Sequence, residues 1–208
     1  MRMTERSKTI EEIVPPEAPQ GAGVFCRLDD GRYLFALYDE RRVGGRALVC
    51  GRIGGRRAPG ESWEQCVERE VMEEASCAAV VESSAECFYA DLDGRIEKVA
   101  VDASPRPGLI SRQPAAGAVV PGGIYYNLVF WARLEGEPRP GAELDALAII
   151  EERLLRALAE RAMTLRELVA AGAQVIPRYD LDADAPVTLG RSTQVLLELL
   201  ERGRRSSG

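Results

Sequence analysis

The sequence contains no histidine, and only two of its 27 basic residues are lysines. Without histidine, the chain cannot build a Ser-His-Asp or Cys-His catalytic system, or a zinc site with imidazole ligands. The cysteines are odd in number and none forms a C-x-x-C pair, which argues against a disulfide framework and against a thiolate metal site. We therefore expect a reducing compartment and free, buried thiols at Cys26, Cys50, Cys66, Cys77 and Cys87.

Long apolar segments are also missing. The N-terminus is charged and lacks the apolar region of a signal peptide. No apolar run approaches the roughly 20 residues that cross a bilayer, so we expect a cytoplasmic protein without a membrane partner. The net charge of −6 argues against a nucleic-acid partner, which would favour a basic face. With 208 residues, 46% of them hydrophobic, a core of ordinary size is expected.

The order of apolar runs and turn signals predicts an α/β chain of the α+β type in three parts. These are an N-terminal arm (1–20), a central domain (21–150) and a helical C-terminal extension (151–208), which is net neutral and could support a homodimer. Expected strands are 22–30 and 32–40 around an Asp30-Gly31 turn, then 46–53, 78–81, 86–89 and 124–134. Expected helices are 62–75, 150–160, one that begins near 164, and 192–202. The Pro- and Gly-rich segment 102–123 is expected to be a long loop, either a lid or an inert insertion.

The helix predicted over 62–75 carries an unusual set of charges. Spacings of three and four residues put Glu70, Glu73 and Glu74 close together, where like charges cost about 0.2–0.5 kcal/mol per pair. A hard divalent cation such as Mg²⁺ would reverse the sign of that interaction, because it prefers oxygen ligands. Glu61 adds a fourth carboxylate, and Arg69 can orient a carboxylate by a bidentate pair. For an arbitrary acidic helix, a solvated face is the commoner explanation.

These residues form part of a longer pattern, G-x5-E-x7-R-E-U-x-E-E-x-G-U with U aliphatic, which residues 55–77 follow at most positions. The chain thereby resembles the Nudix hydrolase family over about residues 20–150. The resemblance implies an α/β/α sandwich with a mixed sheet, bound Mg²⁺ or Mn²⁺, and hydrolysis of a nucleoside diphosphate linked to another moiety. It implies that the metal ligands are Glu70, Glu73, Glu74 and the backbone carbonyl of Gly54. Glu70 would also be the base, with Arg69 as its orienting partner and with Gly55 and Glu61 in support.

The chain departs from the family pattern in three places. The last glycine of the motif is Ser76, where a left-handed helix end would cost on the order of 1 kcal/mol. The proline that often precedes the glycine pair is Ile53. One branch of the family, which removes oxidised nucleotides, has a metal-binding carboxylate on a late strand. The corresponding residue here is Ala132, unless Glu143 or Asp145 supplies the carboxylate instead.

We expect the substrate to be a small nucleotide-like diphosphate, but no motif identifies it further. The residues that bind it are not assigned. Candidate side chains, each more often core or surface than ligand contact, are Tyr33, Tyr38, Tyr125, Tyr126, Trp131, Arg27, Arg46 and Arg52. The alternative function is a Nudix-derived nucleotide sensor that binds without turnover. Decapping of nucleic acid is disfavoured by the acidic charge, and the related isoprenoid diphosphate isomerases by the missing histidines.

Overall fold

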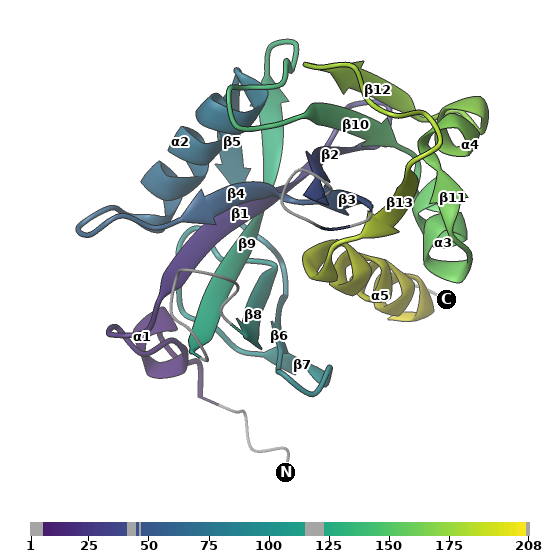
Figure 1. Cartoon of the computed structure of the whole chain (residues 1–208). Coiled ribbons are helices and arrows are strands. Elements are labelled where there is room, and N and C mark those ends of the chain that lie inside the picture. The colour runs from purple at the N-terminus through teal and green to yellow at the C-terminus, as the bar shows by residue number, and fades with distance from the viewer. Residues whose placement is uncertain (1–5, 41–44, 46, 115–122, 207–208) are drawn as a thin grey trace.

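The computed structural model describes residues 6–40, 45, 47–114 and 123–206, with residues 203–206 described as backbone alone. One long strand organises its sheet. Strand β9 (Ile124–Glu135) pairs in parallel with β1 (Gln20–Arg27) along one edge. Along its other edge, β9 pairs antiparallel with β8 (Leu109–Pro114) and then with β5 (Ala78–Glu82). The strand therefore belongs to two branches of one mixed sheet (Figure 1).

The remaining elements complete this sheet and cover it. The other strands are β2 (Tyr33–Asp39), β3 (Leu48–Gly51), β4 (Ile53–Arg56), β6 (Cys87–Ala90), β7 (Ile96–Val99), β10 (Ala146–Ile150), β11 (Met163–Thr164), β12 (Gln174–Pro177) and β13 (Pro186–Leu189). The helices are α1 (Ile10–Ile13), α2 (Trp63–Ala75), α3 (Glu152–Glu160), α4 (Leu165–Ala170) and α5 (Arg191–Ser206). Among the described residues, no helix is both long and apolar enough to span a membrane.

Helices cover the sheet on both faces, which confirms the predicted mixed sheet between helices. On one face, α2 packs its buried Val67 and Val71 into a core with the side chains of β1 and β9 that point that way. On the other face, α3, α4 and α5 pack against a second core around Phe25 and Phe35. Figure 1 shows α2 and this helical group on opposite sides of the strands. The described cysteines are all free and buried, as predicted.

Local sequence signals account for the elements that hold the site. The predicted hairpin is present, because β1 and β2 are antiparallel and the turn between them has Gly31 at φ 85°. Helix α2 begins after Ser62, whose side chain accepts from the backbone N–H of Gln65 at 3.1 Å. The Gln65 side chain accepts in turn from the backbone N–H of Ser62 at 2.9 Å. This capping box fixes where the helix starts and therefore which residues face the sheet.

The C-terminal segment contains the predicted helices but is not only helical. Strand β13 pairs in parallel with β3, and β12 pairs with β10, so the segment adds strands to the main sheet. Leu196 of α5 is fully buried in the same core as Phe25 of β1. The short apolar run Ala146–Ile150 is a buried strand of that sheet, so the predicted helix over 150–160 begins at Glu152 and Ile150 was wrongly placed in it. The boundary at 150 between domain and extension stays a prediction.

The segment 102–123 is not one long loop, so that prediction was wrong over part of its length. Residues 109–114 form β8, which pairs with both β6 and β9. Its first three residues are buried, and pairing within the sheet outweighs the local Pro and Gly content. Residues 115–122 lie outside the described residues, and the lid hypothesis concerns them in part.

Candidate active site

The predicted metal-site residues lie where β4 meets α2. Glu70 and Glu74 face the sheet and are only 8% and 6% exposed, whereas Glu73 points outward. A Cβ at Gly55 would lie 2.3 Å from Oε2 of Glu70, so only glycine lets this carboxylate approach the strand. Buried glutamates without a partner are rare, and these two therefore demand a specific environment.

Arg69 joins the carboxylates of the loop and the helix. Its Nε and Nη2 donate to the two oxygens of Glu61 at 2.8 and 3.1 Å, a bidentate pair. Its Nη1 donates to Oε1 of Glu70 at 2.7 Å and to Oε2 of Glu73 at 2.9 Å. Nη2 also donates to the backbone carbonyl of Arg56 at 2.9 Å. One guanidinium thus fixes three carboxylates relative to the end of β4.

The contacts with Arg69 and the burial of the carboxylates shift the pKa values of the acids in opposite directions. The hydrogen bonds from Arg69 lower the pKa of Glu61 to about 2. Burial raises the pKa of Glu70, against the hydrogen bond from Arg69. Burial also raises the pKa of Glu74 to about 7, and the nearby charge of Glu70 adds to that rise. Glu61 is therefore a permanently ionised anchor for Arg69, and the two buried acids are the strained members of the group.

Glu74 is held by neutral donors from two strands. The backbone N–H of Gly54 donates to its Oε2 at 2.8 Å, and the hydroxyl of Tyr38 donates to its Oε1 at 2.9 Å. Gly54 has φ 137°, a conformation that favours glycine, and a Cβ there would lie 2.3 Å from the Cα of Gly23. The glycine pair is thus needed for the shape of the site as well as for the turn.

The donor set suits a hard divalent cation, although its oxygens do not converge on one point. Among the described residues, no group of three or more His, Cys, Asp or Glu side chains is arranged to hold a metal. Glu70 and Glu73 are turned to Arg69, and Glu74 is turned to Gly54 and Tyr38. Three carboxylates within two helical turns, with bare glycine backbone opposite Glu70, are nevertheless the oxygen ligands that Mg²⁺ prefers.

The end of α2 shows how the chain accommodates its departure from the motif. Ser76 has φ 52° and ψ 32°, the left-handed conformation for which the family pattern has glycine. The backbone N–H groups of Arg139 and Gly141 then donate to the carbonyls of Ala75 and Glu74. The serine is strained, but the helix ends where the pattern requires, and the carboxylates one turn earlier keep their orientation.

Of the aromatic and arginine side chains considered as substrate contacts, some lie at the site and others lie in the hydrophobic cores. Tyr38, Tyr125 and Arg52 lie at the glycine pair, and the Tyr125 hydroxyl donates to the carbonyl of Gly55 at 3.4 Å. Tyr33 and Trp131 contact each other within the second core, 6.5 Å between ring centroids. The rest lie elsewhere or outside the described residues: Tyr126 is buried in the first core, Arg27 is exposed at the end of β1, and Arg46 is not described.

The carboxylates considered as replacements at Ala132 do not join the group. Asp145 is buried beside β2, where its Oδ2 accepts from the backbone N–H of Asp39 at 2.7 Å. Glu143 is exposed. A residue that the sequence analysis missed is Asn127, whose Oδ1 accepts from Nη2 of Arg52 at 2.8 Å. The signal was available, since Asn127 is the one polar residue inside the apolar run 124–132.

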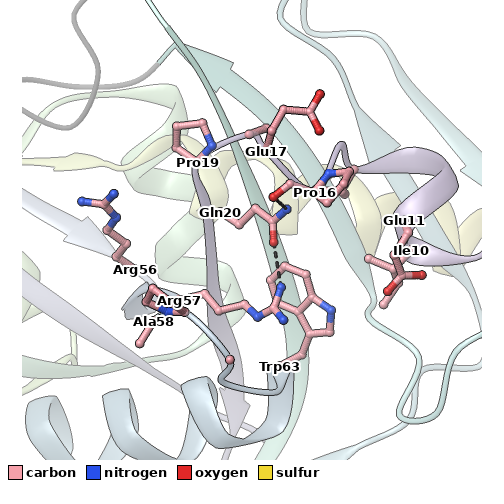
Figure 2. Close-up of a pocket in the computed structure, with 14 residues that line it drawn as sticks. Ile10, Glu11, Pro16, Glu17, Pro19, Gln20, Arg56, Arg57, Ala58 and Trp63 are labelled. Atoms are coloured by element: carbon pink, nitrogen blue, oxygen red, sulfur yellow. Dashed lines mark hydrogen bonds between the residues drawn. The ribbon is translucent and has the colours of Figure 1, made fainter.

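A cavity of about 630 Å³ lies beside the loop before α2, between that loop and the N-terminal arm (Figure 2). Arg57 forms one wall: its guanidinium lies 4.2 Å from the centroid of the Trp63 ring and donates to Oε1 of Gln20 at 2.8 Å. Glu11 and Glu17 line the opposite, arm side. The volume is within the range of small-molecule sites, and the neighbouring Arg56 links this wall to Arg69.

Comparisons with known proteins identify solved structures that are similar to this one. No family model matches the chain, and no curated protein matches it by sequence. A NUDIX hydrolase from Nitrosomonas europaea is 18% identical with a TM-score of 0.46, over 81% of this chain and 100% of that one. A NUDIX-family hydrolase from Clostridium perfringens is 20% identical with a TM-score of 0.46, over 66% and 84%. An ADP-ribose pyrophosphatase from Streptococcus suis is 15% identical with a TM-score of 0.40, over 65% and 75%.

Two of these three similar structures are NUDIX hydrolases. That is the family that the motif at residues 55–77 indicated. Because the TM-scores are below 0.5, we base the functional proposal on the contacts of the site residues.

Proposed function

We propose that the chain is a Nudix hydrolase that cleaves a diphosphate bond in a nucleoside diphosphate linked to another moiety, with Mg²⁺ or Mn²⁺ as cofactor. Glu70, Glu73, Glu74 and the backbone carbonyl of Gly54 would hold the cation. Glu70 would serve as the general base and Arg69 as its positioning residue. The observation that carries this proposal is the set of hydrogen bonds from Arg69 to three carboxylates of the motif, at 2.7–3.1 Å.

A solvated acidic face does not account for these contacts. On such a face the carboxylates would be exposed and would gain little from ion pairs. Instead Glu70 and Glu74 are less than one tenth exposed. By contrast, Glu64 and Glu68 of the same helix are exposed, as a solvated face requires. The two buried glutamates of this helix thus both belong to the motif, whereas Glu73 of the motif is exposed.

The contacts of Glu70 suggest how it would act as a base. Its Oε1 accepts from Arg69, and no described residue donates a hydrogen bond to its Oε2. Oε2 can therefore take the proton of a water molecule as the water oxygen forms a bond to phosphorus. The bond from that phosphorus to the bridging oxygen breaks, and the second phosphate departs with the electron pair. A bound divalent cation shields the phosphate oxygens and lowers the pKa of water.

The proposal is tested with a substrate panel in the presence of Mg²⁺ or Mn²⁺. NTPs, nucleotide sugars, ADP-ribose, NADH, coenzyme A and dinucleoside polyphosphates are incubated in ¹⁸O-labelled water, and products are analysed by mass. Release of a nucleotide and a second product, one of which carries one ¹⁸O on a phosphate, supports the proposal, and the labelled product identifies the phosphorus that is attacked. Tight binding of one compound without turnover of any of them would contradict it and favour the nucleotide sensor.

A further inference from the structure

Asn127 is an unexpected residue in the middle of the sheet. It lies on β9 between Gly21 of β1 and Ser111 of β8, and its side chain is completely buried. Its Oδ1 accepts from Nη2 of Arg52, which fixes the orientation of the amide because a guanidinium can only donate. Its Nδ2 has no hydrogen-bond partner among the described residues. A buried donor without a partner is destabilising, so packing alone does not explain an asparagine here.

Arg52 lies over glycines that leave room for it. A Cβ at Gly23 would be 2.2 Å from Nη1 of Arg52, and a Cβ at Gly54 would be 2.3 Å from it. Apart from the bond to Asn127, the bonds of its guanidinium to described residues are long, at 3.4 Å to the carbonyls of Ala22 and Ile53. The side chain thus stays flat against the sheet beside the glycine pair.

The charge of Arg52 is not neutralised by a direct ion pair. No salt bridge between Arg52 and a carboxylate occurs within the part of the chain that the structure describes. The guanidinium nevertheless lies next to Gly54, whose backbone N–H donates to Oε2 of Glu74. This leaves a half-buried cation, held by a neutral amide, beside the glycine pair.

We propose that Arg52 binds the diphosphate group of the substrate, and that Asn127 is the positioning residue that holds its guanidinium beside the glycine pair. A neutral amide suits this task better than a carboxylate, because it orients the guanidinium without cancelling its charge. The guanidinium fork matches phosphate oxygens, and displacement of the weak contacts to backbone carbonyls costs little. This assignment deepens the proposed function and depends on it for the identity of the anion.

The direct test is binding of inorganic pyrophosphate to the metal-free protein, measured by calorimetry in EDTA. Arg52→Gln should weaken binding about tenfold or more, the loss of one charge-assisted contact. Asn127→Asp should weaken binding similarly, since the new carboxylate holds Arg52 but neutralises it. Arg133→Gln is the control, because it makes the same change in net charge on an exposed position of β9. Equal affinity in all four proteins, or no measurable binding by the wild type, would overturn the assignment.

Kinetics separate this assignment from a merely structural role. On the best substrate, Arg52→Gln should raise KM about tenfold or more while kcat changes little, as expected for uniform binding. Arg52→Lys, which keeps the charge, should recover part of the affinity. Circular dichroism confirms that each variant is folded. If pyrophosphate binding follows these expectations but no panel compound is hydrolysed, the proposed function is wrong and the anion site is supported. If Arg52→Gln hydrolyses the substrate with the KM of the wild type, the anion site is wrong and the proposed function is unaffected.

Discussion

Replacement of Glu74 by glutamine should make the metal-free protein more stable at alkaline pH. The carboxylate is 6% exposed and accepts from Gly54 and Tyr38 at 2.8 and 2.9 Å. Burial raises its pKa to about 7, with a further contribution from the charge of Glu70. Glutamine has nearly the same shape: its amide oxygen can accept from Gly54, and its amide nitrogen can donate to the hydroxyl oxygen of Tyr38.

The sign and size of the effect follow from proton linkage. The folded state holds the Glu74 proton more tightly than the unfolded state, where the pKa is near 4.5. Below pH 4.5 both states are protonated, and stability is lost as the pH rises from there through 7. The difference between 4.5 and about 7 corresponds to about 3 kcal/mol at most. We expect Glu74→Gln to raise the free energy of unfolding by about 1–3 kcal/mol at pH 8 and by little near pH 4.5.

Urea unfolding in EDTA, followed by circular dichroism between pH 4.5 and 8, measures this difference. Glu68→Gln on the exposed face of α2 is the matched control and should follow the wild type at every pH. A Glu74→Gln protein that is less stable than wild type at pH 8 would refute the reasoning. So would a stability difference that does not change with pH, because the argument depends on the proton alone.

Three further substitutions test the packing of the fold by urea unfolding. Ser76→Gly should stabilise the protein by about 0.5–1 kcal/mol, because it relieves the left-handed conformation at φ 52°; a loss of stability would contradict this. Arg57→Ala should lower the free energy of unfolding by about 1–2 kcal/mol, because the contact with Trp63 and the hydrogen bonds of Arg57 are lost. Arg56→Ala, at an exposed side chain, should leave it unchanged, and equal effects of the two substitutions would contradict the described contacts. Leu196→Ala, fully buried on α5, should cost about 2–4 kcal/mol, and a cost below about 1 kcal/mol would show that α5 is not part of the main core.

Elements with strong local signals could be predicted from the sequence. The capping box of Ser62 and Gln65 gave the start of α2, and the Asp30-Gly31 turn gave the first hairpin. The run Ala146–Ile150 was not predicted as a strand, because a short apolar run fits a buried strand and a buried helix segment equally well. Strand β8 was hidden by the surrounding prolines, because its pairing with β6 and β9 is a tertiary effect.

The same distinction applies to the candidate site. The spacing of the carboxylates and Arg69 along α2 is local, and it placed them near one another in the prediction. The partners of Glu74 come from β2 and β4, and Arg52 meets an amide 75 residues away. No local pattern encodes such contacts. Only the asparagine within an apolar strand carried a sequence signal that something polar must fit there.

The central claim is that the carboxylates around Arg69 form a hydrolytic site, and the kcat of Glu70→Gln tests it most directly. The variant is compared with Glu68→Gln on the best panel substrate at saturating substrate and the same Mg²⁺ concentration. Loss of a general base predicts that kcat falls by at least about a hundredfold in Glu70→Gln. Glu68→Gln, which changes the same charge on the exposed face of the same helix, should keep the wild-type value. Equal kcat values in the two variants would contradict the account.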